Sequence, residues 1–135
     1  MVEQILRHDV LYAIIVRNEF RKDGIHFFTP NDLSQQLAYM KHPAGKLIDP
    51  HVHLPVTRQV HRTQEVLVIK AGRLRVDFYG EDEVFLESCT LGAGDVVLLI
   101  AGGHGFEVLE DVEMFEIKQG PYSGDLDKRR FTVAR

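Results

Sequence analysis

Short apolar runs separated by turn residues most constrain what this chain of 135 residues can fold into. The runs are rich in β-branched and aromatic side chains, turn residues separate them, and helical periodicity is scarce. We therefore predict an all-β fold with about ten strands and little helix. The strands are expected at residues 10–17, 25–28, 37–40, 47–52, 65–71, 73–79, 84–89, 95–100, 104–109 and 112–118. A barrel or jelly roll is favoured because it leaves few strand edges open in a short chain.

The middle of the chain has the clearest pattern. Residues 65–71 are almost continuously apolar, a single glycine interrupts the run, and residues 73–79 alternate. Leu74, Val76 and Phe78 then share one face, because side chains two residues apart in a strand point the same way. We predict a hairpin with one buried face.

The chain is predicted to be one domain, residues 1–135, because no long linker or tandem repeat divides it. We assign N-terminal strands to residues 1–44, a barrel core to residues 45–118 and a tail to residues 119–135. Hydrophobic residues make up 44% of the chain and charged residues 27%, which is ordinary for a globular domain.

Charge and cysteine content exclude several classes of function. The net charge of -4 argues against nucleic-acid binding, and no apolar stretch reaches the roughly 20 residues that a membrane helix needs. The single cysteine, Cys89, has no partner for an internal disulfide, and the first residues lack a secretory pattern. We expect a cytoplasmic protein.

Seven histidines are an unusual number for this length, and three of them lie close together in the sequence. In a strand, His51 and His53 would present two imidazoles on one face, an arrangement that can chelate a metal ion. The alternative is a pair of ordinary surface histidines.

Two further residues extend this pattern. Glu65 begins the most hydrophobic strand, where a carboxylate is costly unless it is paired or binds a cation, although it could also be an exposed residue at a strand end. His104 follows two glycines at the start of another strand, and its alternative is a loop histidine. With His51 and His53 they make three imidazoles and one carboxylate, a set suited to divalent Fe, Mn, Ni, Cu or Zn.

These four residues belong to two longer patterns, Gly45-x5-His51-x-His53 with Glu65-x6-Gly72, and Gly94-x5-Ile100-x-Gly102-x-His104. The patterns resemble the two motifs of the cupin superfamily of small β-barrels, G-x5-H-x-H-x3–4-E-x6-G and G-x5-P-x-G-x2-H-x3-N. The resemblance covers residues 45–118. It implies a jelly-roll barrel with a metal ion at one mouth, held by His51, His53, Glu65 and His104.

The chain departs from the family pattern in both motifs. Eleven residues separate His53 from Glu65 where the family has three or four. In the second motif Ile100 replaces the proline, one residue is missing before the histidine, and Val108 stands where asparagine is expected.

A rival alignment keeps the family spacing of the glutamate. His61-x3-Glu65 has that spacing and puts Gln59 where the first histidine belongs. Under this alignment, His61 and Gln59 are additional metal ligands, or they replace ligands of the first alignment.

Residues near the expected site could contact a substrate. Arg58 and Arg62 could clamp an anionic group, because a guanidinium binds carboxylate or phosphate with two hydrogen bonds, or they could be solvated loop charges. Tyr39, Phe78 and Phe106 could line the barrel interior, or they could be core residues.

The resemblance implies a divalent metal with open positions for water, a substrate or dioxygen, and hence oxygenation, isomerisation or lyase chemistry. The tail over residues 115–131 resembles those of small bacterial cupins associated with polysaccharide and sugar-nucleotide chemistry, which suggests a small polar substrate such as a sugar derivative.

Two other functions stay open. One is a module that binds a small ligand without catalysis, since one fold hosts many functions. The other is a metal-free epimerase or isomerase in which a carboxylate supports a histidine base. A homodimer is expected if the N-terminal strands cover or pair with a sheet edge of a second copy.

Overall fold

The computed structural model describes residues 1–133, and these form two compact units. Unit 1 consists of Met1–Phe20 and the chain from Arg62 onward, and unit 2 is Arg21–His61. Each unit has its own β-sheet, and the only helical element among the described residues is a 3-10 turn, η1, at Gly124–Asp127. The predicted all-β class with little helix is therefore confirmed. No helix in this part of the chain is long and apolar enough to cross a lipid bilayer.

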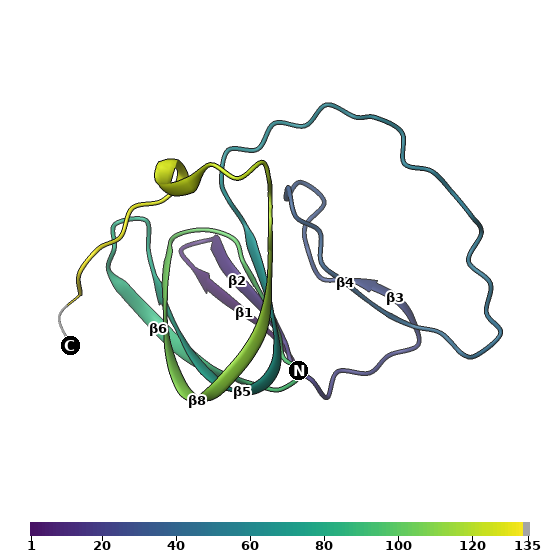
Figure 1. The fold of residues 1–135 in the computed structure, drawn as a ribbon, viewed down its shortest axis with the longest axis horizontal. Coiled ribbons are helices and arrows are strands. Elements are labelled where there is room, and N and C mark those ends of the chain that lie inside the picture. Colours follow the sequence, from purple (N-terminus) through teal and green to yellow (C-terminus); the bar gives the residue numbers. More distant parts are fainter. Residues whose placement is uncertain (134–135) are drawn as a thin grey trace. The chain divides into compact units, whose positions relative to one another are not determined.

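Unit 1 is one strongly curled antiparallel sheet (Figure 1). Its strands run in the order β1-β2-β7-β5-β6, and β8 pairs with β5 as well. The bounds are β1 Val2–Arg7, β2 Val10–Val16, β5 Glu65–Tyr79, β6 Phe85–Gly92, β7 Val96–Leu99 and β8 Gly103–Lys118.

β5 is the central strand and has two halves. Its first residues, from Glu65 to Val68, pair with β7, and Arg73 to Tyr79 pair with β6. β8 runs along both halves on the opposite edge. On one edge, β5 forms a four-residue ladder with β7 and a seven-residue ladder with β6. On the other edge it forms one long ladder with β8, so the whole sheet is connected through β5.

The bend in β5 occurs at Gly72. Its φ is +87°, and a Cβ built on it would lie 1.9 Å from the carbonyl oxygen of Asp111 on β8. The β5–β8 register shifts repeatedly between Ile69 and Leu74, as expected where extra residues bend a ladder. The two halves of the sheet can therefore curl so that their inner faces share one core.

The core lies on the inner face of the curled sheet. β5 contributes alternate residues from both halves, and β1, β2, β6 and β7 complete the cluster. Burying each of these side chains contributes about 1.5–3 kcal/mol before entropy costs. The buried cluster is Ile5, Ala13, Ile15, Leu67, Ile69, Leu74, Val76, Phe78, Leu91, Val97 and Leu99.

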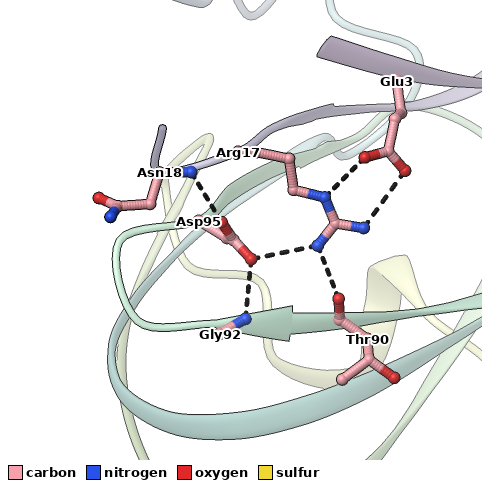
Figure 2. A network of polar contacts seen from close by, with 6 residues as sticks. All are labelled: Glu3, Arg17, Asn18, Thr90, Gly92 and Asp95. Carbon is pink, nitrogen blue, oxygen red and sulfur yellow. Dashed lines mark hydrogen bonds and ion pairs between the residues drawn. The ribbon is translucent and has the colours of Figure 1, made fainter. Parts of the chain in front are cut away.

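Arg17, just after β2, joins three parts of unit 1 (Figure 2). Its Nε donates to the carboxylate of Glu3 on β1 at 2.6 Å, and a terminal nitrogen donates to the carbonyl of Thr90 on β6 at 2.7 Å. The same nitrogen lies 3.1 Å from Asp95, in the turn between β6 and β7. The hydrogen bond from Arg17 lowers the pKa of Glu3 and, in return, raises that of Arg17.

Asp95 fixes that turn from the other side. Its buried carboxylate accepts hydrogen bonds from the backbone amides of Asn18 and Gly92, each at 2.8 Å. The end of β2 is thereby held against the turn that leads into β7.

Unit 2 contains a two-stranded antiparallel sheet of β3 Gly24–Phe27 and β4 Ala38–Lys41. In the connection between them, Thr29 donates to the amide oxygen of Gln36 at 2.8 Å, and Gln36 donates to the carbonyl of Pro30. After β4, residues 42–61 form no strand.

Three features of the predicted strand pattern were wrong. The structure has eight strands in residues 1–133 instead of about ten. Residues 65–79 form one bent strand and not a hairpin, because a positive φ at Gly72 bends the chain without ending the ladder. Residues 103–118 pair with this bent strand and are likewise one continuous strand. The predicted strand at 47–52 does not form, since no sheet edge pairs with it.

Candidate functional site

The curl of unit 1 brings together two residues from opposite ends of the β5–β8 ladder. Glu65 is the first residue of β5, whereas His104 on β8 pairs with Phe78, near the last residue of β5. A straight strand of that length would separate positions 65 and 78 by about 43 Å. His104 Nε2 nevertheless lies 3.7 Å from Glu65 Oε1.

Both side chains belong to the inner face of the sheet. Glu65 alternates with Leu67, and His104 stands directly opposite Phe78, and both of these partners are core residues. The Glu65 side chain is 17% exposed and that of His104 27%. The pair therefore borders the core and still reaches solvent, as a ligand-binding group must.

The polar neighbours of Glu65 favour its ionised form. The interaction with His104 is the main cause that lowers the pKa of Glu65 to about 2, whereas partial burial raises it. Glu116 is a second polar neighbour of Glu65, and the interaction with Glu65 raises the pKa of Glu116. Glu116 lies opposite Leu67 in the register, on the same inner face. The site in unit 1 is thus an imidazole beside two carboxyl groups.

This arrangement suits either metal ligation or proton transfer. An imidazole nitrogen and a carboxylate oxygen are both ligands for divalent transition metals, and a carboxylate can also orient a histidine that acts as a base. Within residues 1–133, however, no group of three or more His, Cys, Asp or Glu side chains could hold a metal ion. Unit 1 therefore brings together two of the four predicted ligands.

The other two predicted ligands are neighbours in unit 2. The ring centroids of His51 and His53 are 5.3 Å apart at an interplanar angle of 77°. His51 Nδ1 lies 2.9 Å from the carbonyl oxygen of Asp49. A hydrogen bond from Nδ1–H to that carbonyl leaves Nε2 available as a ligand.

The alternative ligands and the two arginines lie on exposed chain. His61 and Gln59 belong to the strandless segment of unit 2, as does Arg58. Arg62 forms an ion pair with Glu81, with both side chains 57% exposed, so part of its charge is already compensated.

The three aromatic residues expected near a substrate have different environments. Phe78 is a core residue with 2% of its surface exposed. The Phe106 ring lies 5.4 Å from the ring of His104 and is 38% exposed, so it forms an apolar wall beside the pair. Tyr39 lies on β4 of unit 2, opposite His26.

Sequence reasoning did not find Glu116. The alternation within residues 112–118 puts Met114, Glu116 and Lys118 on one face of a strand, which was a usable signal. That signal does not say which face is inner, because the register against β5 decides this.

A second feature that the sequence did not reveal is a cavity of about 730 Å³ in unit 1. Arg75, Asp77 and Tyr79 contribute to it, and they alternate with the core residues of β5, so it opens on the outer face of the sheet. The Arg75 Nε donates to the buried Asp77 carboxylate at 3.0 Å. The lining is completed by Glu83, Phe85, Ser88, Thr132 and Val133.

No model of a known protein family, no curated protein and no solved structure matches this chain. The likeness of residues 45–118 to the cupin motifs therefore stays a prediction from the motif residues.

Proposed function

We propose that this protein is a metal-binding cupin, which holds a divalent ion at the mouth of a jelly-roll barrel and presents it to a small polar molecule. One observation carries the proposal: two of the four motif residues, Glu65 and His104, lie 3.7 Å apart although they are distant in the β5–β8 register. A tetrahedral ion with bonds of about 2.1 Å holds its donor atoms about 3.4 Å apart. The observed separation is close to that value.

His51 and His53 are the remaining ligands in this proposal. Their support comes from the resemblance to the first cupin motif, from the proximity of their rings and from the carbonyl contact that leaves one ring nitrogen of His51 available. With Glu65 and His104 they make three nitrogen donors and one oxygen donor, a set suited to Fe, Mn, Ni, Cu or Zn. The bound ion would act as a Lewis acid or activate a bound ligand.

The protein residues prepare the site for this role. Glu65 is anionic at neutral pH, so no proton has to leave before it ligates. Phe106 provides an apolar surface next to His104, against which a small molecule can orient. A sugar derivative is the substrate class that the tail resemblance suggests.

The test is the metal content of purified protein, measured by elemental analysis after loading with each candidate ion. His104→Gln and Glu65→Gln should each remove most of the bound metal. His26→Gln is a matched control, because His26 lies on β3 and its Nε2 contacts the carbonyl of Asp23. Equal metal content in all variants, or none in the unaltered protein, would refute the proposal.

The same pair also favours a metal-free alternative. Glu65 contacts His104, so it could orient that histidine as a general base for isomerisation or epimerisation. Chelation separates the two candidates. Turnover of a sugar panel that survives complete metal removal would favour the acid–base function, whereas turnover that returns only with added metal would favour the first.

A further inference from the structure

β8 has a long open edge. Its 16 residues pair with β5 along one side, and no strand within residues 1–133 pairs with the other side. Open edges of this length present unpaired amides and carbonyls that can pair with another chain. Six apolar side chains on the strand are also exposed: Phe106, Val108, Leu109, Met114, Phe115 and Ile117.

The charge on β8 indicates what kind of strand could cover it. Lys118 is its one cationic residue apart from histidine, so its formal charge is -4 from five acidic residues and one lysine. Two copies of β8 would place carboxylates near one another, which disfavours their pairing. A partner strand should be cationic and apolar. The acidic residues are Glu107, Glu110, Asp111, Glu113 and Glu116.

Unit 2 contains a segment with that composition. Residues 46–61 carry Lys46 and Arg58 against Asp49, a formal charge of +1, together with three histidines. The segment forms no strand in the structure, and Figure 1 shows it as extended chain. Its charge is therefore opposite in sign to that of β8.

The same segment has the side-chain period of a strand. From residue 52 to residue 60, apolar side chains occupy every second position except that of Arg58, and polar side chains or proline lie between them. Residues 52–60 thus have the periodicity of a strand but form none, which indicates that the single chain offers them no strand edge to pair with. The apolar side chains are largely exposed: Val52 81%, Leu54 75%, Val56 60% and Val60 48%.

The position of Pro55 selects one edge of this segment for pairing. In an antiparallel strand, alternate residues direct their backbone groups to the same neighbour. The even-numbered residues from 52 to 60 therefore share one edge, and the odd-numbered residues share the other. Pro55, which has no N–H, is odd-numbered, so every residue on the even-numbered edge keeps its N–H donor. Pro55 then faces away from the partner, where it prevents addition of a further strand.

We propose that residues 52–60 of one chain add as a β-strand to the open edge of β8 in a second copy. Both surfaces are exposed in the single chain, their charges are opposite, and a nine-residue strand of about 30 Å fits within the 16-residue edge. Reciprocal exchange produces a two-fold symmetric dimer. The pairing requires no metal and stands independently of the proposed function.

Light scattering on the full chain, with a pair of proline variants, tests this. The unaltered protein should have twice the 15.4 kDa chain mass at micromolar concentration. Val56→Pro removes an inward donor and should weaken dimerisation at least tenfold, whereas Thr57→Pro removes an outward one and should leave the dimer intact. Circular dichroism and thermal melts of both variants check that unit 1 is folded, since neither substitution lies in a strand.

Hydrogen exchange on the unaltered protein gives a second readout that needs no variant. In the dimer, the amides of residues 52, 54, 56, 58 and 60 should exchange more slowly than those of residues 53, 57 and 59. A protein that stays monomeric at all concentrations would overturn the proposal. This holds even if its amides show the same alternating protection, because the pairing would then lie within a single chain. A dimer that both variants leave intact, or that both dissociate, would overturn it as well.

Discussion

Gly72 and Asp111 are in direct contact where β5 and β8 bend. A Cβ on Gly72 would lie 1.9 Å from the Asp111 carbonyl oxygen, and the φ of +87° at Gly72 is unfavourable for any other residue. This contact allows one continuous ladder to curl, and the curl brings Glu65 to His104. The fold and the candidate site therefore depend on the same glycine.

Gly72→Ala should destabilise unit 1 by about 2–4 kcal/mol, because it combines backbone strain with a steric clash. Gly92→Ala is the control, since its Cβ would meet nothing within 4 Å and its φ is not positive. The control should change the free energy of unfolding by less than about 1 kcal/mol. Urea unfolding of both variants measures the difference, and equal midpoints would show that the bend does not need glycine.

Stability should fall in acid partly through Glu65. Its pKa is about 2 in the folded protein against 4.5 for the free group, so its contribution is fully present above pH 4.5 and is lost as pH falls towards 2. The contribution is of the order of 3 kcal/mol at most. The pKa of Glu116 is raised, so the stability that it contributes depends on pH in the opposite direction. This contribution is present at low pH and is lost as pH rises through the pKa of Glu116 in the folded protein.

Glu65→Gln should therefore flatten the profile of unfolding free energy between pH 4.5 and 2, measured by urea denaturation at each pH. Glu87→Gln is a suitable comparison, because its partner Arg7 is substantially exposed. If the two variants have the same pH profile, the pair with His104 is not the origin of acid sensitivity.

Local patterns predicted most strands, but long-range pairing decided where each one began and ended. The β-branched run at residues 10–17 is β2, as predicted. β1 was missed because charged residues interrupt it and only Ile5 of the strand is buried. At Gly72 the sequence indicated a break between two strands, yet whether the chain reverses or bends there depends on the pairing with β8, which is distant in the sequence.

The sequence also predicted the candidate site only in part. Glu65 and His104 were singled out together on chemical grounds, and they do meet. Glu116 was not, since its approach to Glu65 follows from the β5–β8 register. His51 and His53 are neighbours, although the strand that was expected to place them side by side does not form, and their role as ligands stays a prediction.

Arg17 should matter far more to stability than an exposed arginine. Arg17→Met leaves the buried carboxylate of Asp95 without its cation and also removes the hydrogen bonds to Glu3 and Thr90, so we expect a loss of about 2–4 kcal/mol. Arg73→Met breaks only an exposed ion pair with Glu110 and should cost less than about 1 kcal/mol. Thermal melts of the two variants compare them directly, and equal losses would contradict the structural role of Arg17.

Cys89 should be an unreactive thiol in the folded protein. Burial raises its pKa to about 11, so roughly one molecule in ten thousand carries a thiolate at pH 7. Alkylation by iodoacetamide should accordingly be more than tenfold slower than in urea-unfolded protein, where the pKa returns to that of a free thiol. Mass spectrometry over time measures both rates. Equal rates would mean that β6 opens readily, because Cys89 packs against the buried core cluster and pairs with Val76 in the β5–β6 ladder.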